Sequence, residues 1–284
     1  MIRVLDCFAG IAGFTLAGEI INRRIGKEIF KTVGFIEKDE YCQNTLRNLF
    51  PGVPLYGDIR EVSAEILYRG TDVITGGFPC VDLSKSGKGE GLSGKDSGLF
   101  RELLRLSDEF TFINLRPPIL VLENVSNLLD GNGGDWAREL FGELASRRFN
   151  AEWATLQAQQ VGSPHRRERF FLVAWDGAFS DSDGDLCSRR EQISDRNRRD
   201  QIPDASRYYR RSFESRLGSL AYVIPDLMVK GRFWDQEPSG VPRVGARIKD
   251  RVPALKAIGN SVVPEVATIP LMRVAEILGE LKSN

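Results

Sequence analysis

Histidine and paired cysteines, two common signs of a metal site, are scarce in this chain of 284 residues. Its one histidine is His165, and its four cysteines are Cys7, Cys42, Cys80 and Cys187, which lie far apart and include no C-x-x-C pair. This spacing argues against a zinc site and against a disulfide framework. We therefore expect no metal ion and a reducing intracellular compartment.

Long apolar runs and an excess of one charge are also missing. No apolar run approaches the ~18 residues that a membrane helix needs, and the first residues, MIRVLDCFAG, lack the basic start and longer apolar core of a signal peptide. Lysine plus arginine and aspartate plus glutamate each number 39, so the formal net charge at pH 7 is zero. We expect a cytoplasmic protein without membrane contact, on which any surface for nucleic acid must be local.

Residues 1–175 alternate between apolar, strand-like runs and segments with helical spacing. The strand-like runs lead into Gly, Asp, Glu or Cys residues, as in IRVLDCFAG, TVGFIEKD, DVITGGFPC and PILVLENV. Alternation of this kind predicts an α/β domain with a mainly parallel central sheet, in which ligands bind at the carboxyl ends of the strands. Two further runs, FNAEWATLQAQQVG and RRERFFLVAW, are typical of a pair of strands.

The pattern changes after Trp175. Residues 176–250 show little apolar periodicity and are rich in Arg, Asp and Ser. Regular spacing returns in RVPALKAIGNSVVPEVATIPLMRVAEILGEL, whose final part is typical of an amphipathic helix. We predict one domain built from residues 1–175 and 251–284, with a small second region formed by residues 176–250.

Three features in successive strand–helix units favour an adenosine-containing cofactor. Gly10 and Gly13 lie in a turn where the backbone can approach a ligand at a helix N-terminus. Glu37 ends the second strand-like run, where an acid accepts hydrogen bonds from ribose hydroxyls. Asp58 and Ile59 would suit an adenine, as acceptor and as aliphatic contact. Each feature alone also fits an ordinary turn, a solvated acid or a core isoleucine, and FAGIAG is not the G-x-G-x-x-G of NAD sites.

One thiol and one carboxyl are candidate catalytic groups. Cys80 directly follows Pro79 at the end of an apolar run, in a loop rich in Gly, Ser and Lys, which suits a nucleophile better than a core thiol, although most lone cysteines are small buried hydrophobes. Glu123 ends the very apolar run PILVLENV. Burial there would raise the pKa of its carboxyl and let it donate a proton, whereas a helix cap or surface acid is the alternative.

Basic residues add a third candidate element. Arg167 and Arg169 are two positions apart, so on a strand they would share one face. A solvated edge strand is the alternative. His165 would have to serve any Cys-His-Asn hydrolase, and nothing else in the sequence supports that class.

Taken in order, the blocks FAGIAG, GFIEKD, GDI, GGFPCVDLS, ENV, RRER and AIGNSVVP resemble the motifs of C5-cytosine-specific DNA methyltransferases. The resemblance covers most of residues 3–175 and 251–284. It implies a Rossmann-like, S-adenosylmethionine-dependent methyltransferase domain, with a variable target-recognition region at 176–250. The implied reaction methylates C5 of a cytosine flipped out of double-stranded DNA. Host, restriction–modification and phage DNA are equally open as targets.

The resemblance also implies roles for single residues. Cys80 would add to C6 of the cytosine and so make C5 nucleophilic. Glu123 would hydrogen-bond or protonate N3, while Arg167 would contact O2 with Arg169 in support. The catalytic candidates are Cys80, Glu123, Arg167, Arg169, Pro79 and Asn124.

Cofactor and DNA contacts follow in the same way. The cofactor candidates, at strand ends and in the C-terminal segment, are Phe8, Ala9, Gly10, Ile11, Gly13, Glu37, Lys38, Asp58, Ile59, Pro79, Leu99, Asn260, Ser261 and Val262. A loop expected to close over DNA and the Arg-rich middle segment supply the DNA candidates Ser84, Lys85, Ser86, Lys88, Arg189, Arg190, Arg198 and Arg199. We expect a monomer.

Three positions depart from the family pattern. Ala12 stands where a second glycine is usual, and an alanine fits there if its φ is negative. Val81 replaces the glutamine that usually follows Pro-Cys, which removes a polar contact from the catalytic loop. His165 replaces the glutamine that begins the Gln-x-Arg-x-Arg block.

Three other functions compete with this interpretation. A tRNA cytosine methyltransferase shares the motif set, but its Cys-Phe-Thr tripeptide is missing from this sequence. An inactive DNA-binding relative is disfavoured by the intact Pro-Cys, Glu-Asn-Val and Arg-x-Arg motifs. A nicotinamide oxidoreductase would give no reason for Pro79-Cys80 or for GNSVVP. The DNA sequence that is recognised stays open.

Overall fold

The computed structural model describes residues 1–67, 70–79, 97–163, 165–177 and 250–280, and its centre is a seven-stranded sheet in the order β3-β2-β1-β4-β5-β7-β6. The strands are β1 (Ile2–Cys7), β2 (Phe30–Ile36), β3 (Leu55–Tyr56), β4 (Val73–Gly77), β5 (Ile119–Val125), β6 (Phe149–Gln157) and β7 (Glu168–Asp176). Strands β1 to β5 pair in parallel, whereas β7 is antiparallel to β5 and β6. The predicted α/β class, the mainly parallel sheet and the β6–β7 pair are confirmed.

Helices connect the strands. They are α1 (Gly13–Ile25), α2 (Glu40–Leu49), α3 (Phe100–Asn114), α4 (Asn127–Asp130), α5 (Asp135–Ser146), α8 (Arg251–Asn260) and α9 (Pro264–Ile277). Local signals fix several ends: Asp39 caps α2, Gly26 with a φ of 73° ends α1, and Pro264 opens α9. Within the described ranges, no helix combines the length and apolarity that would let it cross a membrane.

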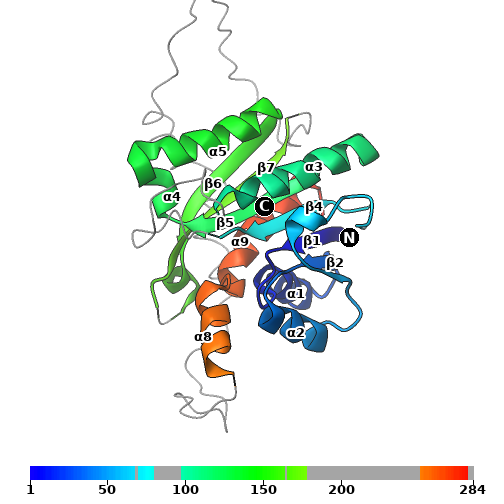
Figure 1. Cartoon of the computed structure of the whole chain (residues 1–284), viewed down its shortest axis with the longest axis vertical. Helices are drawn as coiled ribbons and strands as arrows, with labels where there is room; N and C mark the ends of the chain where they lie inside the picture. Colours follow the sequence, from blue (N-terminus) through cyan, green and yellow to red (C-terminus); the bar gives the residue numbers. More distant parts are fainter. Residues whose placement is uncertain (68–69, 80–96, 164, 178–249, 281–284) are drawn as a thin grey trace, which may run out of the picture.

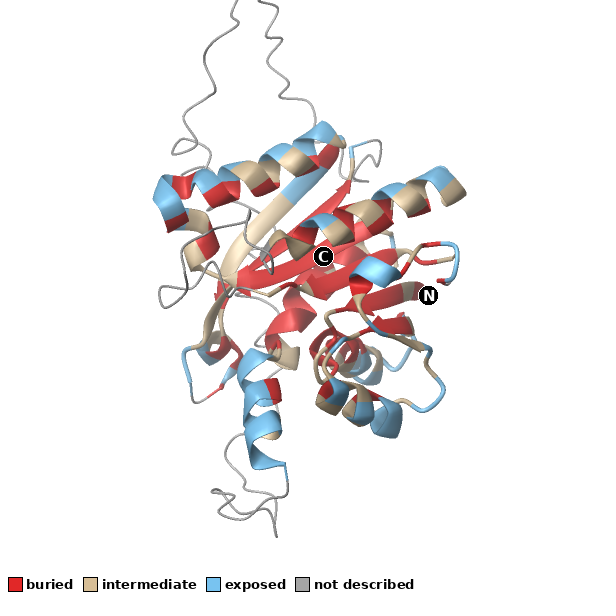
Figure 2. Ribbon diagram, in the orientation of Figure 1, coloured by how far each residue is buried: buried red, intermediate tan, exposed pale blue. Residues whose placement is uncertain are grey.

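Helices α1 and α9 cover one face of the sheet and α3 and α5 cover the other, whereas α8 projects away from the sheet (Figure 1). Because side chains alternate along a strand, Val4 and Val121 pack with α1 and α9, while Leu5 and Leu120 pack with α3 and α5. The central strands are consequently buried on both faces (Figure 2). Their apolar runs are therefore continuous in the sequence rather than alternating.

Helix α9 differs from the amphipathic helix that the sequence predicts. Residues 266–271 and 273–275 are all buried, because the helix contacts α1 as well as β5 and β7. Even Arg273 is only 3% exposed, and its Nη2 lies 2.9 Å from Glu152 Oε1 on β6. The prediction of a one-sided helix is wrong, since this segment is an interior element.

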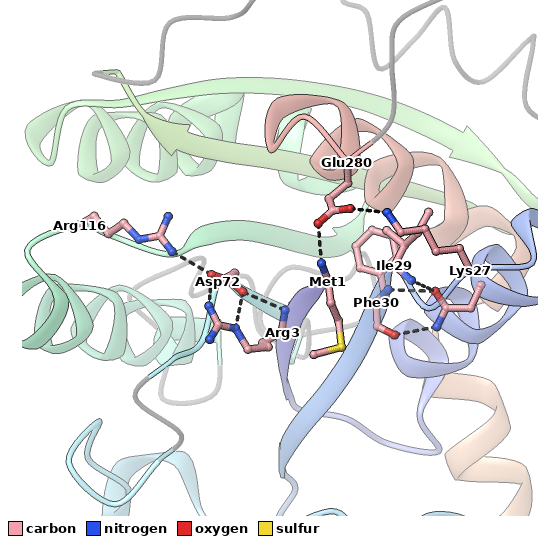
Figure 3. Close-up of polar contacts among 9 residues, drawn as sticks. Met1, Arg3, Lys27, Ile29, Phe30, Asp72, Arg116 and Glu280 are labelled. Carbon is pink, nitrogen blue, oxygen red and sulfur yellow. Dashed lines mark hydrogen bonds and ion pairs between the residues drawn. The ribbon is translucent and has the colours of Figure 1, made fainter.

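The amino edge of the sheet is held by the chain's own ion pairs (Figure 3). Asp72 accepts hydrogen bonds from Arg3 Nε and Nη2 at 2.7 and 2.9 Å, and from Arg116 Nη2 at 2.9 Å. Lys27 Nζ donates to Glu280 Oε2 at 3.0 Å, which joins the end of α1 to the end of α9. The carboxyl edge, by contrast, carries a cavity.

Candidate active site

A cavity of about 560 Å³ opens at the carboxyl edge of the sheet. This volume lies within the roughly 300–1,000 Å³ of small-molecule sites. Its walls come from the residues that end or follow β1, β2, β4 and β5, from the turn after β3, from the start of β7, and from α8 with the segment behind it. The predicted site residues that line it are Phe8, Ala9, Gly10, Gly13, Glu37, Lys38, Asp58, Ile59, Pro79, Leu99, Glu123, Asn124, Arg167, Arg169, Asn260, Ser261 and Val262.

Other predicted site residues are not found in this wall. Ile11 is described but is not among the lining residues. The catalytic candidate Cys80 and the DNA candidates all lie outside the described residues: Ser84, Lys85, Ser86, Lys88, Arg189, Arg190, Arg198 and Arg199. The described residues contain no group of three His, Cys, Asp or Glu side chains that could hold a metal ion.

The turn from β1 into α1 has left-handed backbone at three positions. The φ angles are 51° at Phe8, 55° at Gly10 and 70° at Ala12. The condition under which an alanine fits without strain at position 12, a negative φ, is not met, and the turn closes through a hydrogen bond of 2.8 Å from Ala12 N to Ala9 O. Left-handed backbone costs a residue with a Cβ roughly 1–2 kcal/mol, so this wall of the cavity is strained.

Gly13 permits a close approach within the protein. A Cβ at this position would lie 2.7 Å from the carbonyl oxygen of Val262 and 2.9 Å from its Cβ. Gly13 lines the cavity, so its predicted approach to a ligand stays a prediction, and it also lets the first residue of α1 contact the C-terminal segment. That contact completes one wall of the cavity.

We expect Gly13→Ala to lower the free energy of unfolding by roughly 1–3 kcal/mol, because the new methyl group overlaps backbone atoms that must move. Gly142→Ala is the matched control. Gly142 is an exposed interior residue of α5 with no atom within 4 Å of a built Cβ, so alanine should instead stabilise by roughly 0.5–1 kcal/mol. Urea denaturation of both variants tests this, and equal shifts would contradict the close approach at Gly13.

Glu37 braces the strained turn from the end of β2. Its Oε2 accepts a hydrogen bond from Gly10 N at 2.7 Å, and its Oε1 accepts one from Asp39 N at 2.7 Å. The carboxylate therefore joins two of the strand ends that form the cavity. Its predicted contact with a ribose stays a prediction.

Asp58 is held by two neighbouring cations. Its Oδ1 accepts from Arg60 N and Nε at 3.1 and 2.9 Å, while its Oδ2 contacts Arg60 Nη2 at 2.5 Å and Lys38 Nζ at 3.0 Å. The hydrogen bonds from Arg60 hold the pKa of the Asp58 carboxyl well below its usual range. Ile59 beside it is 2% exposed and also belongs to the core under α3.

Glu123 is a buried acid at the inner end of the cavity. It lies near the end of β5 opposite Gly77, is 7% exposed, and its Oε1 is 3.2 Å from Arg169 Nε. Burial raises the pKa of its carboxyl to about 7, against the opposing charges of Arg169 and Arg167. A Cβ at Gly77 would come within 3.1 Å of Glu123 Oε2, so this glycine leaves room for the carboxyl. The sequence-based expectation of a raised pKa agrees with this geometry.

Asn124 fixes the chain that leads to Cys80. Its side chain is 2% exposed, and its Nδ2 donates to the carbonyl oxygen of Phe78 at 3.1 Å. The link runs from β5 to the residue before Pro79. Pro79 is thereby held at the cavity, directly before Cys80 in the sequence.

The two arginines point to different partners. Strand β7 begins at Glu168, and Arg167 precedes it with a φ of 22°, so the prediction that both arginines share one face of a strand is wrong. Arg167 Nη1 and Nη2 donate to the carbonyl oxygens of Gly259 and Ser261 at 2.8 and 2.7 Å. Arg169 is the one that contacts Glu123.

Several lining residues were missed by sequence analysis. Most are one or two positions from predicted residues, whereas those on helices carried no signal, since which helical side chains face the cavity depends on packing. Lys256 of α8 is an example: its Nζ lies 3.1 Å from Asp39 Oδ2 across the cavity mouth. The missed residues are Phe14, Ile36, Asp39, Cys42, Gly57, Arg60, Gly77, Phe78, Val125, Lys256, Ala257 and Gly259.

Asp6 is a second buried acid, beneath the strained turn. It is 1% exposed, its Oδ2 accepts from Thr15 Oγ1 at 2.8 Å, and its Oδ1 accepts from Thr75 Oγ1 at 2.8 Å. Burial raises the pKa of its carboxyl to about 6 although these hydrogen bonds oppose the rise. Asp6 thus ties β1 to α1 and β4.

Glu123 and Asp6 should make the protein more stable at pH 5 than at pH 7. Both carboxyls have folded-state pKa values, about 7 and about 6, above their ordinary values. The folded chain therefore binds protons more tightly, and the resulting stability is lost as the pH rises through these values. The gain on moving from pH 7 to pH 5 is of the order of 3 kcal/mol, roughly two thirds of it from Glu123. Urea denaturation at both pH values tests this, and Glu123→Gln should remove the larger share.

The chain matches a family of known proteins. The family model for "C-5 cytosine-specific DNA methylase" matches residues 2–221. Type II methyltransferase M2.BsuMI of Bacillus subtilis (strain 168) is 31% identical over 207 residues, covering 73% of this chain and 50% of that protein. Type II methyltransferase M.MspI of Moraxella sp is 30% identical over 174 residues, covering 61% and 38%. The chain thus spans half or less of the length of these relatives.

One solved structure is similar in fold, in a comparison that covers nearly the whole chain. The crystal structure of S. pombe Dnmt2 methyltransferase gives a TM-score of 0.55 and covers 98% of this chain and 99% of that one. The sequence identity is 14%, so the likeness concerns the fold alone.

Proposed function

This chain belongs to the C-5 cytosine-specific DNA methylase family, and we propose on that basis that it transfers a methyl group from S-adenosylmethionine to C5 of a cytosine in double-stranded DNA. The observation that carries the proposal is the buried Glu123, with a pKa of about 7 and Arg169 at 3.2 Å, in one cavity with Pro79. Addition to a cytosine ring requires a nucleophile, a proton donor and a nearby cation. The cavity holds the last two, together with Pro79, which directly precedes Cys80, the proposed nucleophile, in the sequence.

The cavity suits an adenosine-containing cofactor, which would supply an electrophilic methyl group. Its volume of about 560 Å³ is adequate, and its wall mixes backbone amides and acids with apolar side chains. Glu37 already accepts two backbone hydrogen bonds, and a carboxylate has about four acceptor sites, so it can also accept from ribose hydroxyls. We assign Phe8 and Gly10, with Ala9, to the methionine end, and Asn260, Ser261 and Val262 to closing the cavity.

Binding of adenine at Asp58 would require one of the present contacts of this carboxylate to be replaced. Asp58 already has four contacts from Arg60 and Lys38, so an adenine amino group would have to replace one of these donors. Lys38 is the most exposed of them, with 70% of its side chain accessible. Ile59 and Leu99 supply apolar contact in the same wall.

The chain's own residues account for the chemistry on the base. Addition of the Cys80 thiolate to C6 would place negative charge towards N3 and O2 of the cytosine. Glu123 donates a proton to N3, and Arg169 donates a hydrogen bond to O2. We assign O2 to Arg169 rather than Arg167, because both terminal nitrogens of Arg167 donate to backbone carbonyls, whereas in Arg169 only Nη1 does so, to the carbonyl oxygen of Glu168. After methyl transfer, the C5 proton passes to a base such as water, the Cys80 sulfur leaves C6 as a thiolate, and N3 returns its proton to the Glu123 carboxylate, which restores the ring.

Recognition of DNA is proposed from the sequence. Residues 176–250 are the proposed target-recognition region between the two parts of the catalytic domain, 1–175 and 251–284. Their support is the density of arginine, which can contact phosphates and read guanine.

Transfer of label tests the function. Purified protein, S-adenosylmethionine with a labelled methyl group and duplex DNA should give labelled 5-methylcytosine in the DNA, and sequencing for this base would show the site. Label in tRNA but not in DNA, or in neither, would overturn the proposal.

A further inference from the structure

One wall of the cavity is held in place from outside by α3. The short 3₁₀ turn Ile59–Glu61, with Asp58 at its start, forms this wall. Arg105 of α3, which does not line the cavity, donates from Nη2 to the carbonyl oxygens of Ile59, the first residue of the turn, and of Val62, the residue directly after it, each at 2.9 Å. One guanidinium nitrogen therefore bonds both ends of the turn.

Two glutamates of α3 fix the guanidinium. Glu102 Oε2 accepts from Arg105 Nε at 2.7 Å, and Glu109 Oε1 accepts from Arg105 Nη1 at 2.5 Å. The second oxygen of Glu109 accepts from Ala64 N at 2.7 Å. Three backbone groups between residues 59 and 64 are thus bonded by two side chains that lie one helical turn apart.

The turn is short, and its backbone bonds are few. Strand β3 before it contains two residues. The backbone hydrogen bonds inside the turn run from Glu61 N to Asp58 O at 3.0 Å and from Val62 N to Ile59 O at 3.3 Å, beside the cap from Arg60 N to Asp58 Oδ1 and the packing of Ile59 and Val62 in the core. Helix α3 begins directly after Leu99, which also lines the cavity. The residue directly before the helix, Leu99, therefore lines this wall, and the helix itself holds Ile59 in the wall through Arg105.

We propose that Arg105 and Glu109 form a clamp that positions the adenine-binding wall at Asp58 and Ile59. This inference rests on the proposed function, in which the cavity binds an adenosine-containing cofactor. Neither side chain lines the cavity, so Arg105 is a positioning residue: it acts on the cofactor through the backbone of Ile59.

The clamp predicts a selective loss of cofactor binding. Arg105→Met keeps the aliphatic stem but removes the hydrogen bonds to the turn. The KM for S-adenosylmethionine and the Kd for S-adenosylhomocysteine should rise roughly tenfold, while kcat and the KM for DNA stay within twofold. Arg105→Lys, which restores one donor, should recover part of the loss.

Arg147→Met is the matched control. Arg147 pairs with Asp108 of α3 and with Glu143, and its side chain is 27% exposed against 33% for Arg105. It removes a comparable ion pair from the same helix without touching the turn. Its thermal stability should fall about as much as that of Arg105→Met, with cofactor KM unchanged. Equal changes of cofactor KM in the two variants would mean that Arg105 affects only the overall stability of the protein, and this result would overturn the proposal.

Glu109 gives an independent test if Arg105→Met does not fold. Glu109→Gln keeps an acceptor for Ala64 N, whereas Glu109→Leu does not, so the Kd for S-adenosylhomocysteine should rise severalfold only in the leucine variant. Calorimetric measurement of S-adenosylhomocysteine binding by the wild type distinguishes failure of the proposed function from failure of the clamp. No binding of S-adenosylhomocysteine by the wild type would overturn the proposed function. Wild-type binding with unchanged affinity in Arg105→Met and Glu109→Leu would overturn the clamp alone.

Discussion

Duplex DNA that carries fluorine at C5 of the target cytosine will remain covalently joined to this protein through Cys80. In the proposed reaction, the C5 proton must leave before the thiol can be eliminated. Fluorine cannot leave as a cation, so methyl transfer can occur but release cannot. The adduct should survive denaturing electrophoresis, should need S-adenosylmethionine for full yield, and should map to Cys80 by peptide mass.

Two serine variants make this test specific. Cys80→Ser should form no adduct, because a hydroxyl is far less ionised than a thiol near neutral pH. Cys42→Ser is the matched control: Cys42 lines the cavity, but burial and the carboxylates of Glu37 and Asp39 raise the pKa of its thiol to about 12. It should cross-link like the wild type. Methylation of ordinary DNA without any cross-link, or a cross-link at another cysteine, would refute the role of Cys80.

Glu123→Gln should lower kcat by roughly 10²–10⁴, the usual contribution of a positioned general acid. The amide keeps the size of the side chain and cannot supply the N3 proton. It also removes an ionisable group from a buried position, so loss of folding would not explain the result. Steady-state kinetics with duplex DNA measures the change.

The pH dependence identifies the mechanism of that loss. Only protonated Glu123 can donate, and its pKa is about 7. The ratio of wild-type to Glu123→Gln rates should therefore fall roughly tenfold per pH unit above pH 7, and taking the ratio cancels the ionisation of Cys80. Glu168→Gln, next to Arg169 in the sequence, should behave like the wild type. A ratio independent of pH would exclude proton donation by Glu123.

The strand ends of the site could be predicted from the sequence because each follows a continuous apolar run. Glu37 and Glu123 come after runs that can only be buried strands, and parallel strands bring their carboxyl ends to one edge. The same pattern indicated that Glu123 could be buried with a raised pKa, but it left a helix cap or surface acid as the alternative, which the 7% exposure of Glu123 excludes. For such residues, local sequence and tertiary position agree.

The remaining features depend on packing that the local sequence does not carry. Arg167 breaks strand alternation through one positive φ, and Ala12 adopts left-handed backbone although alanine disfavours it. Lys256 and Arg105 act across the fold on residues remote in sequence. Helix α9 has no exposed residue because α1 covers the side that would otherwise face water. None of these follows from residue type and spacing.

The cavity joins the two ends of the chain, and this has a consequence for synthesis on the ribosome. Lys256 meets Asp39 across 217 positions of sequence, and Val262 packs on Gly13. A nascent chain paused anywhere in residues 178–249 has emerged with Glu123 but without α8 and the segment after it. Such a translation intermediate would lack one wall of its methyl-donor site. The proposed methylation of DNA would therefore begin only after residue 262 has left the exit tunnel, so synthesis of this protein and its proposed action would be separate in time.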